Sequence, residues 1–227
     1  MSLADYKETV AITATVLTII QFLSGIDICF KIAKQGSTGD LSGFPFVGGV
    51  FSTCMWLSYG WVLHDLSMSV TNGVGLFLQA TYLLIYIRYC IALGPWYALR
   101  RQMMVLFTVG LTMLYLTFFT ESASEVRESR LGLVCCAASV LFCASPLISL
   151  KEVFRTQSTE CLPLPLILAT CVVTGLWWLY GIIIENSFVQ YPNLIGCGIS
   201  GLQLLLFVIY PRKRKGFKRT SYSGFYV

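Results

Sequence analysis

The sequence WLSYGWVLHDLSMSVTNGVG at residues 56–75 recurs, with changes, as WWLYGIIIENSFVQYPNLIG at residues 177–196. The tryptophan, tyrosine, asparagine and glycine positions keep one shift, because 177 − 56, 180 − 59 and 193 − 72 each equal 121. The pair Ser37-Thr38 recurs as Ser158-Thr159 at the same shift. Chance similarity between apolar runs would not hold one register across such different residue types. The chain therefore contains an internal repeat.

The composition is that of a chain embedded in lipid. Of its 227 residues, 56% are hydrophobic and 12% are charged, whereas soluble domains carry about 25% charged residues. Seven apolar runs have roughly the 20 residues that a helix needs to cross a bilayer. Because backbone groups at lipid depth must be paired, the predicted fold class is an all-α integral membrane protein with seven transmembrane helices. The predicted spans are residues 10–30, 44–63, 69–89, 103–120, 131–150, 163–184 and 187–210.

The repeat groups these spans into two parallel three-helix units. The first three spans form one copy, the last three form the other, and the fourth is a linker helix, which gives a 3+1+3 arrangement. An even number of crossings separates the two copies, so both run in the same direction. Such parallel repeats are typical of transporters with a site at the repeat interface near the middle of the membrane. The predicted division is a first repeat at 1–101, a linker helix and outer loop at 102–130, a second repeat at 131–211, and a basic cytoplasmic tail at 212–227.

Lysine and arginine lie unevenly on the two sides of this topology. One side receives 13 of them and the other receives 3, which together make the 16 in the chain. Since these residues favour the cytoplasmic side, the N-terminus is predicted outside and the C-terminus inside. The tail RKRKGFKR at residues 212–219 indicates contact with anionic lipid rather than nucleic acid. A multi-pass plasma-membrane protein is predicted, and a Golgi location stays open because no sorting signal is evident.

Two amides and two tryptophans are the candidate binding residues. Asn72 and Asn193 occupy equivalent positions in the two copies, as do Trp56 and Trp177. Amides exchange hydrogen bonds with polar solutes, and flat aromatic rings pack against apolar C–H faces. One helical turn before the tryptophans, Ser52 and Val173 are expected to face the same cavity.

Other function classes fit the sequence less well. The chain shows no nucleophile–base pair, metal cluster or acid dyad, so no enzymatic activity, metal or cofactor is predicted. A seven-span receptor would not contain two parallel copies. A non-transporting membrane scaffold that binds partners through its basic tail remains an alternative.

The paired motifs resemble those of the SWEET sugar transporters, also called the nodulin/saliva family, and most closely the animal members. The likeness rests on STGDLSGFPF, WLSYG, VTNGVG, QSTECLPLP, WWLYG and YPNLIG, and extends over about residues 21–211. It implies a passive, bidirectional uniporter of glucose-like mono- or disaccharides that works by alternating access. Assembly into a homo-oligomer is compatible with this resemblance.

A related alternative is a PQ-loop-like transporter of amino acids or another small polar solute. Those proteins share the repeat but carry a Pro-Gln pair at the start of spans two and six. Here Pro45 is followed by Phe46 and Pro165 by Leu166.

The resemblance also assigns roles to individual residues. It makes the Asn pair contact the sugar and the Trp pair stack on it. Further pocket walls are implied at Thr18, Gln21, Ser139 and Phe142. Hinges are implied at Pro45, Pro146 and Pro165, with Gly25 in place of a fourth proline, and an outer gate at Tyr59, Tyr180, Asp65 and Asn186. An interfacial tyrosine belt is an equal reading of the two tyrosines.

Asp27 is the one acid inside the first predicted span. A carboxylate at membrane depth is a functional candidate, here for proton coupling. Lys31 lies one helical turn further on, and we expect the two to form an ion pair.

Overall fold

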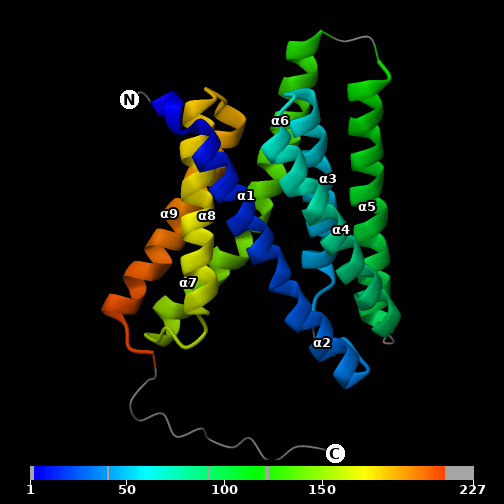
Figure 1. The fold of residues 1–227 in the computed structure, drawn as a ribbon. Helices are drawn as coiled ribbons and strands as arrows, with labels where there is room; N and C mark the ends of the chain where they lie inside the picture. Colours follow the sequence, from blue (N-terminus) through cyan, green and yellow to red (C-terminus); the bar gives the residue numbers. More distant parts are fainter. Residues whose placement is uncertain (1–2, 40, 91–92, 121–122, 213–227) are drawn as a thin grey trace, which may run out of the picture.

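The computed structural model describes residues 3–39, 41–90, 93–120 and 123–212. These residues form one short 3₁₀ helix, nine α-helices and no strand (Figure 1). Their bounds are η1 (Leu3–Tyr6), α1 (Lys7–Leu23), α2 (Gly25–Gln35), α3 (Phe44–Val62), α4 (Leu66–Tyr89), α5 (Leu93–Phe118), α6 (Ser124–Phe142), α7 (Ala144–Thr156), α8 (Leu164–Ile183) and α9 (Ser187–Ile209). Most of the predicted basic tail lies outside the described residues.

The nine α-helices make seven spans, because two spans are broken in the middle. α1 and α2 meet at Ser24, and α6 and α7 meet at Cys143. The predicted all-α fold with seven transmembrane helices in a 3+1+3 arrangement is confirmed. Both broken spans are first members of a repeat, so the break belongs to the repeated unit.

Six of the seven spans are long and apolar enough to cross a membrane by composition alone among the described residues, and α3 is the exception. Small and polar residues lower the hydropathy of α3, and Gly48, Gly49 and Thr53 are buried inside the protein. α3 packs against α4, α5 and α6. A helix surrounded by other helices needs less apolar surface than one that faces lipid.

The linker helix is longer than predicted. α5 begins at Leu93, ten residues before the predicted start at 103, since 103 − 93 = 10. The predicted division points at 101/102 and 130/131 therefore fall inside α5 and α6 rather than in loops. Sequence placed the boundary too late because Arg100 and Arg101 interrupt the apolar run without interrupting the helix.

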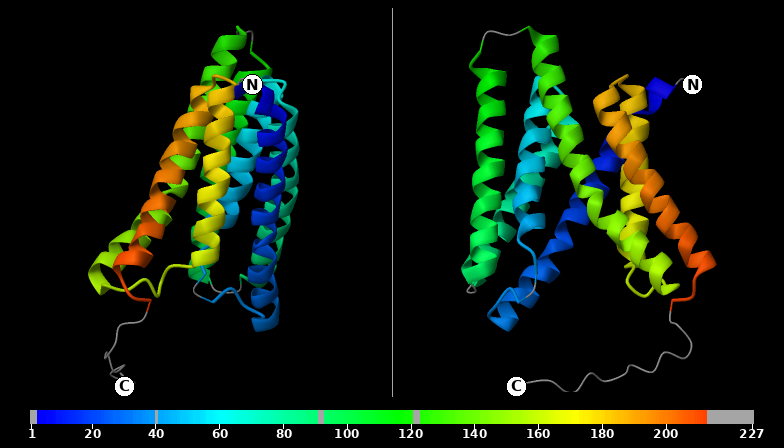
Figure 2. Two further views of the ribbon diagram at one scale, coloured as in Figure 1. Left: turned by 60° about the vertical axis from the view of Figure 1, so that its left-hand side comes forward. Right: turned by 180° about the vertical axis from the view of Figure 1, so that it is seen from behind.

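The two triplets are joined by their first spans. α1 packs on α4 in its own triplet and on α8 in the other, and α6 correspondingly packs on α9 and on α3. Figures 1 and 2 show α1 passing from the side of α8 to the side of α4. The triplets converge at the end that carries the N-terminus and diverge at the end where α9 finishes. These are called the N-terminal end and the C-terminal end of the bundle.

The buried cores follow the same shape. One cluster at the N-terminal end draws residues from both triplets, including Met55 and Tyr59 of α3 and Trp177 and Tyr180 of α8. Toward the C-terminal end there are two separate clusters, one around Ile32 in the first triplet with α5 and one in the second triplet. Apolar packing therefore holds the triplets together at one end only.

Backbone conformations repeat with the sequence. Left-handed residues end α2 and α7 at Gly36 and Gln157, which are 121 residues apart. The two tight hairpins use the left-handed residues His64 and Glu185, again 121 apart. Each is followed by a side chain that caps the next helix, and this short connection leaves the capping residue at the N-terminal end of the bundle.

The repeated Ser-Thr motif anchors a loop at the C-terminal end. Thr38 donates its backbone N–H to Tyr89 O at 3.3 Å, and Thr159 donates to Pro211 O at 3.1 Å. Both threonines are buried. Each loop that follows a broken span is thereby fixed to the end of its triplet's third span.

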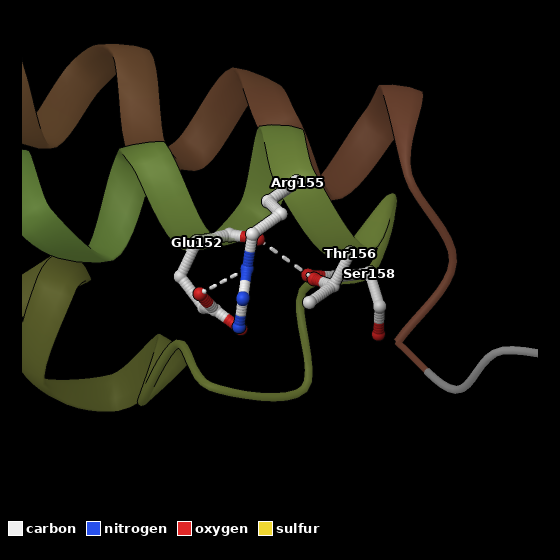
Figure 3. A network of polar contacts seen from close by, with 4 residues as sticks. All are labelled: Glu152, Arg155, Thr156 and Ser158. Carbon is white, nitrogen blue, oxygen red and sulfur yellow. Dashed lines mark hydrogen bonds and ion pairs between the residues drawn. The ribbon is translucent and has the colours of Figure 1, made fainter.

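Further polar contacts lie beside the second of these anchors. The Arg155 guanidinium makes two hydrogen bonds to the Glu152 carboxylate, at 3.0 Å from Nε and 2.8 Å from Nη2, and Thr156 Oγ1 donates to Glu152 O at 2.8 Å (Figure 3). Ser158 Oγ donates to Arg212 O at 3.3 Å. Because the ion pair is exposed, it adds little to the backbone anchor.

Candidate functional site

A cavity of about 300 Å³ lies between the two triplets. This is at the small end of the range for ligand pockets, about 300–1,000 Å³. Eight of the residues proposed from sequence line it: Thr18, Trp56, Asn72, Ser139, Phe142, Pro146, Trp177 and Asn193. Both triplets contribute, as expected for a site at a repeat interface.

The two asparagines take matching positions in the lining. Asn72 Nδ2 donates to Met68 O and Asn193 Nδ2 donates to Val189 O, each at 2.8 Å. Each bond ties the amide to the preceding turn of its own helix, so the side chain has a fixed direction. One N–H and the Oδ1 acceptor of each amide remain for a ligand in the cavity.

The tryptophans are held by the opposite triplet. Trp177 Nε1 donates to Thr18 Oγ1 at 2.9 Å, and Trp56 Nε1 donates to Ser139 Oγ at 3.3 Å. Thr18 and Ser139 are themselves equivalent, since 139 − 18 = 121. The sequence suggested Thr18 and Ser139 as pocket walls and the two tryptophans as stacking rings. In the structure these four residues form two symmetric hydrogen bonds between the triplets.

Three residues proposed from sequence do not belong to the lining. Ser52 is half-buried in α3, and Val173 is buried in the core cluster of the N-terminal end. Gln21 lies behind the wall, where its Nε2 donates to Thr170 Oγ1 at 2.8 Å and Thr170 lines the cavity. Helical periodicity gives the face of a helix but not the depth at which a cavity ends.

Sequence reasoning missed Pro192, which lies inside α9 and lines the cavity next to Asn193. Proline has no N–H, so the carbonyl of Phe188 loses its helical partner. Cys136 of α6 donates its thiol to Phe188 O at 3.4 Å instead. A proline in the interior of an apolar run, directly before a candidate amide, was the signal that could have found it.

The hinge positions differ from what was expected. Pro45 and Pro165 lie in the first turn of α3 and α8, where the missing N–H costs no helical hydrogen bond, so neither kinks its helix. Pro146 lies in the first turn of α7, beside the break at Cys143. Gly25 begins α2 directly after the break at Ser24. The spans are interrupted by the breaks at Ser24 and Cys143 and not by Pro45 or Pro165.

Gly25 and Pro146 face different partners in the two copies. The ring of Tyr82 packs directly on Gly25, and its hydroxyl donates to Phe22 O at 3.1 Å. At the equivalent of Tyr82, Gln203 is buried, lines the cavity and donates from Nε2 to Pro146 O at 3.4 Å. A side chain at position 25 has no room, which explains the glycine there.

The four proposed gate residues meet at the N-terminal end. Tyr59 OH lies 2.8 Å from Asn186 Nδ2 and 3.0 Å from its Oδ1, and Tyr180 OH donates to Asp65 Oδ2 at 2.5 Å. Both bonds join one triplet to the other. Tyr59 and Tyr180 are 0% and 2% exposed, which disfavours an interfacial belt.

Asp27 lies apart from the site. It is exposed on α2 and does not line the cavity. No ion pair with Lys31 is present among the described side chains, so the expected pairing is not observed. Within the described residues no cluster of three or more histidine, cysteine or acidic side chains could hold a metal ion.

Comparison with known proteins follows the same repeat. Residues 8–92 and 129–215 match the family described as "Sugar efflux transporter for intercellular exchange". The two matched segments begin 129 − 8 = 121 residues apart. The chain belongs to the SWEET family. The SWEET match excludes all of α5, which agrees with the place of this helix as a linker between repeats. The family consists of transporters rather than enzymes.

Individual SWEET proteins are similar over nearly the whole chain. The "Sugar transporter SWEET1" of Drosophila pseudoobscura pseudoobscura is 38% identical, over 99% of this chain and 95% of its own length. The human "Sugar transporter SWEET1" is 30% identical, over 88% of this chain and 89% of its own. A solved eukaryotic SWEET transporter superposes with a TM-score of 0.81 at 25% identity, covering 91% of this chain and 98% of that one.

Proposed function

We propose that this chain is a passive, bidirectional carrier of a mono- or disaccharide that works by alternating access. The observation that carries the proposal is the pair of symmetric amides, Asn72 and Asn193, in a cavity between two repeats. Family membership supports the same conclusion, because the similar proteins are named sugar transporters. Each amide offers one donor and one acceptor, which matches a polyol.

The structure corresponds to one state of such a cycle. The tyrosine bonds to Asp65 and Asn186 and the shared apolar cluster join the triplets at the N-terminal end. The separate clusters leave the C-terminal end divided. In the proposed orientation the N-terminal end faces outside, so this state is open toward the cytoplasm. We also propose that the protein lies in the plasma membrane, with the Golgi membrane as the alternative location. Assembly into a homo-oligomer is a further expectation.

The proposal is tested by labelled glucose uptake into proteoliposomes. Asn72→Ala and Asn193→Ala each remove hydrogen bonds to the sugar, and a lost bond costs about 1–3 kcal/mol, or roughly 5- to 150-fold in rate. Thr81→Ala on α4 is the matched control, because its hydroxyl bonds only to Phe77 O and lies outside the cavity lining. Uptake by the Asn variants at the rate of the unaltered protein would contradict the site.

A panel of labelled solutes separates the alternatives. Uptake of amino acids without uptake of sugars would favour the PQ-loop-like function. A passive carrier equilibrates its substrate and does not accumulate it when a proton gradient is imposed. Accumulation driven by such a gradient would contradict passive transport and direct attention to Asp27.

A further inference from the structure

The two halves of the gate differ in charge. In one half Tyr180 donates to the carboxylate of Asp65, whereas in the other half Tyr59 meets the neutral amide of Asn186. A hydrogen bond to a carboxylate is roughly twice as strong as one between neutral groups. By its own residues, the half with Asn186 would be the weaker one.

Glu128 supplies a carboxylate to this weaker half from a different helix. It lies in the second turn of α6, and its Oε1 is 3.1 Å from Asn186 Nδ2 and 3.4 Å from Tyr59 OH. Its equivalent in the first copy is Lys7, since 128 − 7 = 121, and Lys7 lines an outer hollow together with Asp65. The acid of one half is therefore Asp65, the N-cap of α4, and the acid of the other half is Glu128 on α6, the first span of its triplet.

The hydrogen bonds of Asn186 fix which way its amide points. Its Oδ1 caps α9 by accepting from Phe188 N at 3.0 Å and Val189 N at 3.2 Å. The cap directs Nδ2 toward Tyr59 and Glu128, so the amide donates a hydrogen bond to the Glu128 carboxylate. Asparagine, unlike aspartate, can satisfy both the helix cap and Glu128.

We propose that Glu128 is a third member of this half of the gate and that it is the reason position 186 must be an amide. The proposal deepens the transport function above and rests on it. It predicts that an acid at position 186 weakens this half of the gate, although the acid Asp65 strengthens the other half. Introducing the acid of the first copy by Asn186→Asp places two carboxylates about 3 Å apart, and like charges at this distance cannot both ionise cheaply.

The test is a double-mutant cycle with Asn186→Asp and Glu128→Gln. Both substitutions preserve side-chain shape, and aspartate also caps helices well. Asn186→Asp alone should weaken the closed gate, Glu128→Gln alone should weaken it less, and the double variant should restore it. In the double variant the glutamine amide donates to the new aspartate, so donor and acceptor have exchanged places.

Gate closure is read out by labelling the thiol of Cys143, which lines the cavity. Full-length protein in sealed right-side-out and inside-out vesicles is treated with a membrane-impermeant maleimide, and adducts at Cys143 are counted by peptide mass spectrometry. The gated side is the one from which the unaltered protein reacts slowly. Thermal unfolding of every variant is measured in parallel, so a folding defect is recognised separately.

We expect Asn186→Asp to raise labelling from the gated side by about ten-fold, which corresponds to about 1.4 kcal/mol. The double variant should return to within about two-fold of the unaltered protein. The matched control is Glu125→Gln, which replaces an exposed acid one turn before Glu128 on α6 and should leave labelling unchanged.

Two results would overturn the proposal. One is unchanged labelling in Asn186→Asp, and the other is equal labelling in Asn186→Asp with and without Glu128→Gln. If Asn186→Asp unfolds, Glu128→Ala takes its place, and normal labelling of that folded variant would equally refute a gate role. Labelling needs no substrate, so it tests the gate separately from transport. If the double-mutant cycle gives the expected labelling but the protein takes up no sugar, the proposed function is rejected and the gate assignment stands.

Discussion

Gly25→Ala places a methyl group where the ring of Tyr82 already lies. The new Cβ would contact Tyr82 Cε2 and lie 2.8 Å from Cδ2 and 3.0 Å from Cζ, whereas carbon atoms pack at about 3.5–4.0 Å. The ring must therefore move by about 1 Å, although it is only 4% exposed. Overpacking of this kind costs about 1–3 kcal/mol.

Two smaller effects modify this magnitude. Moving the ring stretches the 3.1 Å bond from Tyr82 OH to Phe22 O, which costs about 0.5–1.5 kcal/mol if it is lost. Alanine regains about 1 kcal/mol of helix propensity over glycine. The net destabilisation is about 0.5–3.5 kcal/mol, and it is measured as a lower midpoint of thermal unfolding in detergent.

The second repeat supplies the rescuing substitution. Gln203 stands at the equivalent of Tyr82, so Tyr82→Gln should remove the clash and make Gly25→Ala harmless, with a coupling energy of about 1–3 kcal/mol. Gly198→Ala is the control, because nothing lies within 4 Å of a Cβ built there. Equal destabilisation by Gly25→Ala in the presence and absence of Tyr82 would refute the packing argument.

Two further predictions concern the cavity wall. Thr18→Val keeps the shape of the side chain but leaves Trp177 Nε1 without its acceptor, so we expect a loss of about 1–3 kcal/mol in thermal stability in detergent. An unchanged unfolding midpoint would mean that this bond does not hold the triplets together. Cys136→Ala should cost about 0.5–1.5 kcal/mol, because Phe188 O then has no donor. In the background Pro192→Ala, whose new N–H restores the helical bond, that cost should disappear, and a persistent cost would show that the thiol acts elsewhere.

The repeat made much of the fold and part of the site predictable. A constant shift identified the triplets and paired Asn72 with Asn193, and both side chains lie in the same cavity. It also paired Tyr59 with Tyr180, whose hydroxyls bond across the bundle. Symmetry transfers a position from one copy to the other, so it predicts well wherever both copies use the same chemistry.

The misses lie where the copies differ or where the position of a residue within its helix decides its effect. Glu128 has a lysine as its equivalent, so no repeated pattern marks it as a gate residue. Pro45 and Pro165 were expected to act as hinges because proline bends a helix interior, but each lies in the first turn of its helix, where the missing N–H breaks no helical hydrogen bond.

The spacing between each gate residue and its cavity amide has a mechanical consequence. Asp65 and Asn72 are seven residues apart along α4, and Asn186 and Asn193 are seven apart along α9, so each pair lies on one face of a rod about 10 Å long. Tilting such a rod to break the tyrosine bond displaces the amide at the same moment, and no relay through other side chains is required. Pro192 interrupts the rod in α9 alone, so α4 transmits the tilt whole while α9 can absorb some of it.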